Sequence, residues 1–83
     1  MIRLEVRLLP TRQLIGYLVT EFHGKDNDDG SVTGEGWTAR FINGAPIQLG
    51  PNTRVPVLFI EVQGDREAEA AAFLQRMTMR GGG

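Results

Sequence analysis

The last third of the chain constrains the fold most, because a strongly apolar strand pattern there runs into an amphipathic helix pattern. The run Val55–Val62 is rich in β-branched and aromatic residues and is bounded by turn-forming residues, which is typical of a largely buried strand. Gln63 and Gly64 interrupt this run, and Asp65 is a suitable N-cap for a helix over Asp65–Met79. The apolar residues of that helix recur at helical spacing and predict its buried face: Ala70, Phe73, Leu74 and Met77.

The N-terminal third predicts a strand followed by a helix. Apolar and charged residues alternate strictly from Ile2 to Leu8, which predicts a half-buried strand that ends at Pro10. The segment Thr11–His23 carries its apolar residues on one helical face, with Thr11 as an acceptable N-cap and Gly24 where a C-terminal glycine belongs. A buried strand over the same residues is the alternative, because short apolar runs separate the two states poorly.

The middle of the chain predicts two further strands. After a polar, acidic loop at residues 25–31, the stretch Val32–Ile42 has the pattern of one extended strand, in which Gly34 and Gly36 mark a bulge or bend. Asn43-Gly44 is the strongest short hairpin signal and suits a type I′ turn. A short strand over Ala45–Leu49 then returns to a second turn at residues 50–52.

These elements predict a single α+β domain over residues 1–83, with a glycine tail from residue 80. The order β-α-β-β-β-α and its short connections favour a four-stranded, mainly antiparallel sheet with two helices on one face, of ferredoxin-like flavour. The expected core consists of Leu4, Val6, Leu14, Leu18, Phe22, Trp37, Phe41, Leu58, Ile60, Phe73, Leu74 and Met77.

Composition excludes several classes of function. The chain has no cysteine, which removes disulfides, thiolate nucleophiles and iron–sulfur clusters, and fits a cytoplasmic protein. The net charge of −1 argues against binding to nucleic acid, and the N-terminal pattern is neither a signal peptide nor a membrane span. Eight of the nine basic residues are Arg, which weakly indicates a thermophile or a GC-rich genome.

No residue pattern predicts catalysis, a metal or a cofactor. The glycine spacing in residues 34–39 resembles a dinucleotide-binding loop, but it leads into a strand rather than a helix. The acidic run at residues 26–30 lacks carboxylates at the first and last positions of a calcium loop. His23 and Ser31, the only residues of their kinds, are better placed for a helix end and a turn than for a catalytic triad.

One face of the predicted sheet is the candidate ligand or partner surface. If the first strand pairs with residues 57–62, charged side chains and an aromatic ring gather on the face away from the helices. We expect this face to hold Arg3, Arg7, Arg40, Phe59 and Glu61. The alternatives are a solvated surface with weak ion pairs, a subunit interface, or a shallow groove for a small anion.

The segment Glu61–Leu74 resembles the strand-to-helix segment of the acylphosphatases, which have a ferredoxin-like fold. The resemblance is structural, because the phosphate loop of that family is missing and Leu8–Arg12 stands in its place. Its enzymatic implication is a divergent phosphate-ester hydrolase in which Arg12 holds phosphate and Asn43 places a water. Overall the chain also resembles short uncharacterised proteins of thermophilic bacteria.

The terminal Gly81–Gly83 resembles the diglycine tail of ubiquitin-like proteins and of the small sulfur carriers for molybdopterin and thiamine synthesis. This resemblance implies a carrier protein, although in those families the tail follows a strand rather than a helix. The leading interpretation from the sequence is a non-enzymatic interaction or oligomerisation module, as a homodimer or with a protein partner. The hydrolase and the carrier protein are its alternatives.

Overall fold

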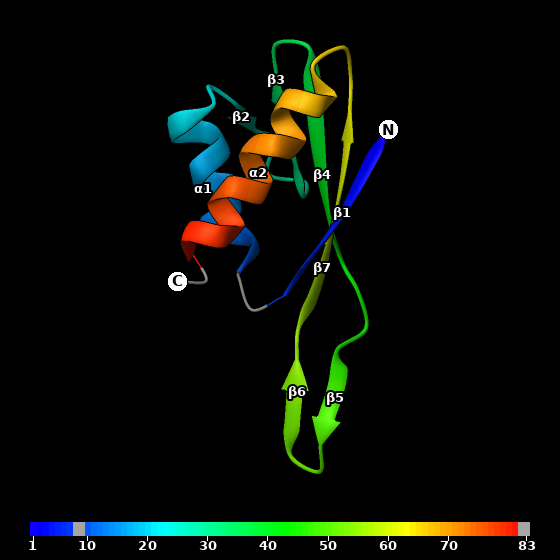
Figure 1. The fold of residues 1–83 in the computed structure, drawn as a ribbon. Helices are drawn as coiled ribbons and strands as arrows, with labels where there is room; N and C mark the ends of the chain where they lie inside the picture. Colours follow the sequence, from blue (N-terminus) through cyan, green and yellow to red (C-terminus); the bar gives the residue numbers. More distant parts are fainter. Residues whose placement is uncertain (8–9, 82–83) are drawn as a thin grey trace.

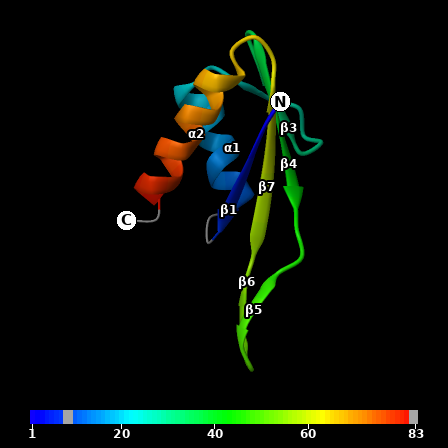
Figure 2. The ribbon, with the colours of Figure 1, turned by 45° about the vertical axis from the view of Figure 1, so that its right-hand side comes forward.

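The computed structural model describes residues 1–7 and 10–81, with side chains described up to Met79. Figures 1 and 2 show two helices side by side on one face of a sheet, and a narrow ribbon of two strands that projects from the end of the sheet. In chain order the elements are β1 (Ile2–Arg7), α1 (Thr11–Glu21), β2 (Lys25–Asp26), β3 (Ser31–Gly34), β4 (Trp37–Asn43), β5 (Ile47–Gly50), β6 (Thr53–Val55), β7 (Val57–Gln63) and α2 (Glu67–Gly81).

The main sheet has five strands in the order β1-β7-β4-β3-β2, and every neighbouring pair is antiparallel. The α+β class and the placement of both helices on one face are therefore confirmed. The acidic loop adds the short β2, and the predicted strand Val32–Ile42 is divided into β3 and β4. The predicted strand Ala45–Leu49 does not join this sheet but forms β5 of the separate two-stranded β5–β6 ribbon, so the main sheet has five strands instead of the predicted four.

Helix α1 confirms the helical interpretation of Thr11–His23, but both predicted caps are wrong. Pro10 occupies the N-cap position without a side-chain hydrogen bond, so the helix starts at Thr11 rather than being capped by it. At the other end His23 takes the left-handed conformation, with φ of 58°, that was expected for Gly24. The Gly24 amide donates to the Leu18 carbonyl at 2.8 Å and closes the helix end.

The predicted bulge at Gly34 and Gly36 is in fact a hairpin turn. Gly34 pairs with Trp37 across β3 and β4, which leaves Glu35 and Gly36 as a two-residue loop. Gly36 has a φ of +83°, which a residue with a side chain rarely adopts. The reversal could not be inferred from the pattern, because strand-like residues continue on both sides of the turn.

Asn43-Gly44 is not a hairpin turn, although its sequence favours one. The Gly44 amide donates to the Val57 carbonyl at 2.9 Å, so the ladder between the two strands continues past Asn43. A Cβ at Gly44 would lie 2.6 Å from the Phe59 ring, and glycine is needed there for packing. The chain reverses instead at the predicted second turn, residues 51–52, at the tip of the β5–β6 ribbon.

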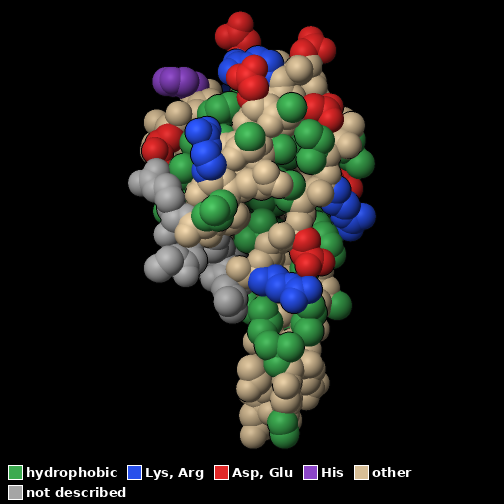
Figure 3. Space-filling model, viewed as in Figure 1, with side chains coloured by type: hydrophobic (Ala, Val, Ile, Leu, Met, Phe, Trp, Pro, Cys, Tyr) green, Lys and Arg blue, Asp and Glu red, His purple; other side chains and the backbone are tan. Residues whose placement is uncertain are grey.

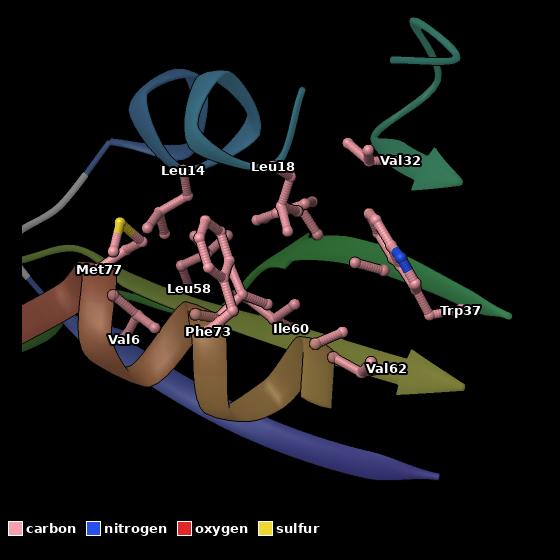
Figure 4. Close-up of a cluster of buried hydrophobic side chains, with 14 residues drawn as sticks. Val6, Leu14, Leu18, Val32, Trp37, Leu58, Ile60, Val62, Phe73 and Met77 are labelled. Carbon is pink, nitrogen blue, oxygen red and sulfur yellow. The ribbon is translucent and has the colours of Figure 1, made fainter. Parts of the chain in front are cut away.

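The hydrophobic core lies between the sheet and the two helices, as Figure 4 shows. Ten of the twelve predicted core residues are buried, and the other two, Leu4 and Phe22, are half-buried and pack against the core. Ala70, predicted on the buried face of its helix, is also buried. Among the described residues, the predictions omitted five buried apolar side chains, namely Val32, Ala39, Val57, Val62 and Ala71.

Trp37 is packed against three glycines from three different segments. A Cβ at Gly34 would overlap the indole ring, and one at Gly24 would lie 2.8 Å from its Cη2 atom. A Cβ at Gly64 would lie 2.8 Å from the Trp37 Cα atom and would overlap the Gly36 carbonyl oxygen. The indole of Trp37 thus requires glycine after α1 and at the end of β3, and the backbone at Gly36 and Trp37 requires glycine after β7. Trp37 as a whole is 3% exposed.

Helix α2 begins at Glu67, two residues later than predicted. The backbone before it is fixed by the hairpin, because the Arg66 amide donates to the Gly36 carbonyl at 2.7 Å. Asp65 precedes the helix, and its carboxylate accepts no hydrogen bond from another described residue, so the predicted N-cap is wrong. Glu67 and Glu69 lie in the first turn, where negative charge is favourable, as predicted.

We predict opposite effects for two Gly-to-Ala substitutions. Gly64→Ala should lower the free energy of unfolding by about 2–4 kcal/mol, because φ is +125° and the added methyl group meets backbone atoms. The control Gly16→Ala, in α1 with open space at its Cβ, should raise it by about 0.5–1 kcal/mol. Urea unfolding of both variants measures the difference, and equal midpoints would contradict the proposed packing.

Candidate functional site

The open face of the sheet brings the predicted ligand-face residues together. The register places Arg3 of β1 and Arg40 of β4 on either side of Glu61 in β7. Phe59 lies next along β7, between Glu5 and Ile42. Because side chains two residues apart share a face, Arg7 also lies on this side. We call these five predicted residues, Arg3, Arg7, Arg40, Phe59 and Glu61, the arginine face.

The arginines of this face are held in different ways. The Arg3 guanidinium lies 4.4 Å from the centre of the Phe59 ring, within the range of a cation–π contact. The Arg7 guanidinium forms an ion pair of 3.0 Å with Glu5 on the same strand. Arg40 forms no ion pair or hydrogen bond within the described part of the chain, although its charge helps to lower the pKa of Asp29. Arg40 is therefore the arginine most available to a ligand.

The polar side chains of the acidic loop form hydrogen bonds within the loop and with the adjoining strand rather than a ligand site. The Ser31 hydroxyl and amide both donate to Asp29. These hydrogen bonds lower the pKa of the Asp29 carboxyl below its ordinary value of 3.8, and the bond from the hydroxyl has the largest effect. Asn27 donates to the hydroxyls of Ser31 and Thr33, and the Asp28 amide donates to Asp26. Within residues 1–7 and 10–81, no three carboxylates or histidines cluster closely enough to hold a metal ion.

The two residues of the hydrolase hypothesis do not share a cavity. Arg12 lines a pocket of about 370 Å³ together with Asp26 and Asp28, which are acidic and unsuited to phosphate. Asn43 lies at the end of β4, opposite Leu58 of β7, and does not line that pocket. The acidic pocket beside Arg12 therefore does not support the hydrolase hypothesis.

A groove between the two helices is a feature that the sequence did not reveal. It has a volume of about 660 Å³ and lies where the end of α1 meets the second half of α2. Its floor includes the rings of Phe22 and Phe73, which stack with centroids 4.7 Å apart. The six lining residues are Glu21, Phe22, Phe73, Arg76, Met77 and Met79, and we call this the interhelical groove.

The glycine tail continues directly from α2. The helix runs to Gly81, so the sequence-based statement that the tail follows a helix is correct. Residues 82 and 83 lie outside the described residues, as does the expectation that they project freely into solvent. The interhelical groove is thus lined partly by residues of the helix that carries the tail.

Comparison with known protein families identifies the chain. A family model described as "archaeal MoaD-like protein" matches residues 2–83, nearly the whole length. The chain belongs to this family. A comparison with curated proteins finds no match.

Membership of the archaeal MoaD-like family corrects the expected relationship to acylphosphatases. The likeness at Glu61–Leu74 reflects a buried strand followed by a helix, a local arrangement that unrelated α+β proteins share. The family indicates a small protein of the carrier type, which was an alternative from the sequence, and a protein partner.

None of the described helices is long and apolar enough to cross a membrane.

For the arginine face we predict that replacing Arg7 and Arg40 together by Gln removes anion binding and barely affects stability. Phosphate titrated into the wild-type protein should shift amide resonances of β1, β4 and β7, and the double variant should show no shift. The free energy of unfolding should change by less than about 1 kcal/mol, because exposed ion pairs contribute little.

The matched control for that experiment is the double variant Arg12→Gln, Arg54→Gln, whose residues belong to α1 and β6 rather than to β1, β4 or β7, and which should keep the phosphate shifts. A wild-type spectrum that phosphate leaves unchanged would show a plain solvated surface. Unfolding of the Arg7, Arg40 variant would show that these arginines are structural.

Proposed function

We propose that the protein is a carrier that presents the carboxylate of Gly83 to an activating enzyme, as small sulfur carriers do. The family match, which extends through residue 83, and the three glycines at the end of the matched region support this proposal. Glycine lacks a side chain, so a tail of glycines can enter a narrow channel and approach a nucleotide closely. In this role the protein is a substrate of its partner rather than an enzyme.

The chemistry takes place on the tail and needs ATP and a sulfur nucleophile. An oxygen of the Gly83 carboxylate attacks the α-phosphorus of ATP, and the bond to pyrophosphate breaks to give an acyl adenylate. Hydrosulfide then attacks the carbonyl carbon, AMP leaves with the carbon–oxygen bond electrons, and a thiocarboxylate remains. Neither step needs an oxidant or a reductant.

The body of the domain suits this role because it holds α2 in a fixed position. Ala70 and Leu74 are fully buried and Phe73 and Met77 nearly so, which fixes one side of the helix against the sheet. At the start of the helix, Arg66 donates to the Glu35 carbonyl at 3.3 Å and pairs with Glu69 at 2.8 Å. A fixed helix presents its terminal residues at a defined place on the surface.

We predict that the intact protein is adenylated and then thiocarboxylated in the presence of ATP, hydrosulfide and an adenylating enzyme from the same organism. Mass spectrometry should show an increase equal to the replacement of one oxygen by one sulfur. A variant that lacks Gly82 and Gly83 should fold normally and gain no mass. The proposal requires Gly83 to bear the terminal carboxylate in the cell, and the intact mass tests this as well.

The absence of both pyrophosphate exchange and a mass change with every adenylating enzyme of the organism would overturn the carrier proposal. A mass change that persists after Gly82 and Gly83 are deleted would also overturn it, because the modification would then lie elsewhere.

The β5–β6 ribbon favours a second role, the association of two copies of this chain. The ribbon extends the molecule to 44 Å along its longest axis, against 23 and 22 Å along the others. Its strand β5, Ile47–Gly50, has no charged residue, and Leu49 is 67% exposed. On the face shown in Figure 3 the projecting end carries no charged side chain.

Charges normally protect exposed strand edges from pairing with other chains. The described edge strands β1 and β2 carry such charges, whereas β5 does not. Two copies of β5 can pair in an antiparallel way about a two-fold axis, because a backbone edge is complementary to itself.

We predict a dimer of twice the 9.2 kDa chain mass that the substitution Leu49→Lys dissociates. Sedimentation equilibrium over a range of concentrations measures the association. Ala68→Lys, at an exposed position of α2, is the matched control and should leave the dimer intact. A wild-type protein that stays monomeric at millimolar concentration would refute this role.

A further inference from the structure

We propose that the activating enzyme docks on the interhelical groove and recognises this protein partly through contact with Met79. This inference rests on the proposed carrier function and adds the surface through which the partner is recognised. The observations that carry it are the length of chain beyond α2, the shape of the groove and the exposure of Met79.

In the proposed carrier role the reacting residue, Gly83, lies two residues beyond the end of α2, which rules out a distant docking site. Two residues follow Gly81, and two fully extended residues span at most about 7 Å. When α2 keeps its described length, an enzyme that acts on the Gly83 carboxylate must therefore place its reacting groups within that distance of the helix end. Its surface around the active site then necessarily covers the last turn of α2.

The surface beside that last turn is apolar and hollow. Met79 is 76% exposed, the most exposed of the large apolar side chains in the described part of the chain. Along a helix it lies only about 3 Å in axial rise from Gly81. Met79 forms part of the wall of the interhelical groove, and a neighbouring hollow of about 490 Å³ shares Phe22, Arg76 and Met79 with it.

The chemistry of the groove defines what the partner must supply. Phe22, Phe73 and Met77 offer an apolar floor that an inserted aliphatic or aromatic side chain would fill. Methionine adapts its shape to different apolar partners, which suits Met79 at the rim. Arg76 and Glu21 add one charge of each sign to the lining, so a partner with an acidic and a basic group at matching places complements it.

The other candidate surfaces are badly placed for this partner. The arginine face lies on the opposite side of the sheet from α1 and α2, as Figure 2 shows for the two layers. The β5–β6 ribbon projects from the end of the sheet, and its tip lies away from the helices in both ribbon views. An enzyme bound only at either place would not cover the end of α2.

Substitution of Met79 by Glu tests the docking surface. With the adenylating enzyme and ATP, Met79→Glu should raise the KM for this protein by about tenfold or more and leave kcat unchanged. The matched control is Ala68→Glu, which places the same charge at an exposed apolar residue near the start of α2 that lines neither hollow. The control should keep the wild-type KM, and both variants should keep the wild-type melting temperature, because both sites are exposed.

A competition experiment gives a readout that does not depend on turnover of the variant. The chain without Gly82 and Gly83 should inhibit activation of the wild-type protein, because it retains the groove. The same truncated chain with Met79→Glu should not inhibit. Wild-type kinetics in Met79→Glu, or a truncated chain that does not compete, would overturn the groove as docking site while the carrier function stands. Failure of the wild-type protein to be activated would instead overturn the carrier function, and this inference with it.

Discussion

The packing of Trp37 against glycine backbone is the contact on which the rest of the structure depends. The indole ring lies against Gly24 after α1 and Gly34 at the end of β3, and the main chain of Trp37 lies against Gly64 before α2. Phe22 adds an aromatic contact to the indole at 5.4 Å between centroids and stacks on Phe73 of α2. The position of both helices over the sheet is thus fixed at one corner, beside the β3–β4 hairpin. Since the glycine tail and the interhelical groove belong to these helices, their places follow from the same contact.

The sequence predicted those elements whose pattern reflects a single buried face. The alternation in β1 and the helical spacing in α1 and α2 arise because each segment packs one side against the same core, so local periodicity was sufficient. The turns were harder to predict from the sequence. Asn43-Gly44 has the composition of a tight turn, but Phe59 packs on Gly44 and the strand continues. At Gly36 the reversed chain is held by contacts to Arg66, which lies far away in sequence.

The two candidate surfaces also differ in how far the sequence could predict them. The arginine face could be predicted because strand pairing and alternation determine which side chains share a face, and the register places its residues as expected. The interhelical groove depends on how two helices approach each other, and helix periodicity alone contains no such information. Its floor residues Phe22, Phe73 and Met77 were correctly assigned to the interior side of their helices. That these side chains line a common hollow between the helices emerged only from the packing.

The glycines at the end of α2 also affect how far the tail reaches. Glycine destabilises a helix by about 1 kcal/mol relative to alanine. Unwinding the last turn of α2 therefore costs little free energy when a partner binds the tail in an extended form. Each residue that changes from helix to extended chain adds about 2 Å of reach. Met77 limits this process, because its side chain is 6% exposed and unwinding past it would remove a core residue at a loss of about 1.5–3 kcal/mol. At most four described residues, 78–81, can unwind without that loss, which extends the tail by about 8 Å. Even then the chain emerges at Met77, on the floor of the interhelical groove, so an enzyme that binds the extended tail still meets the floor formed by Phe22, Phe73 and Met77.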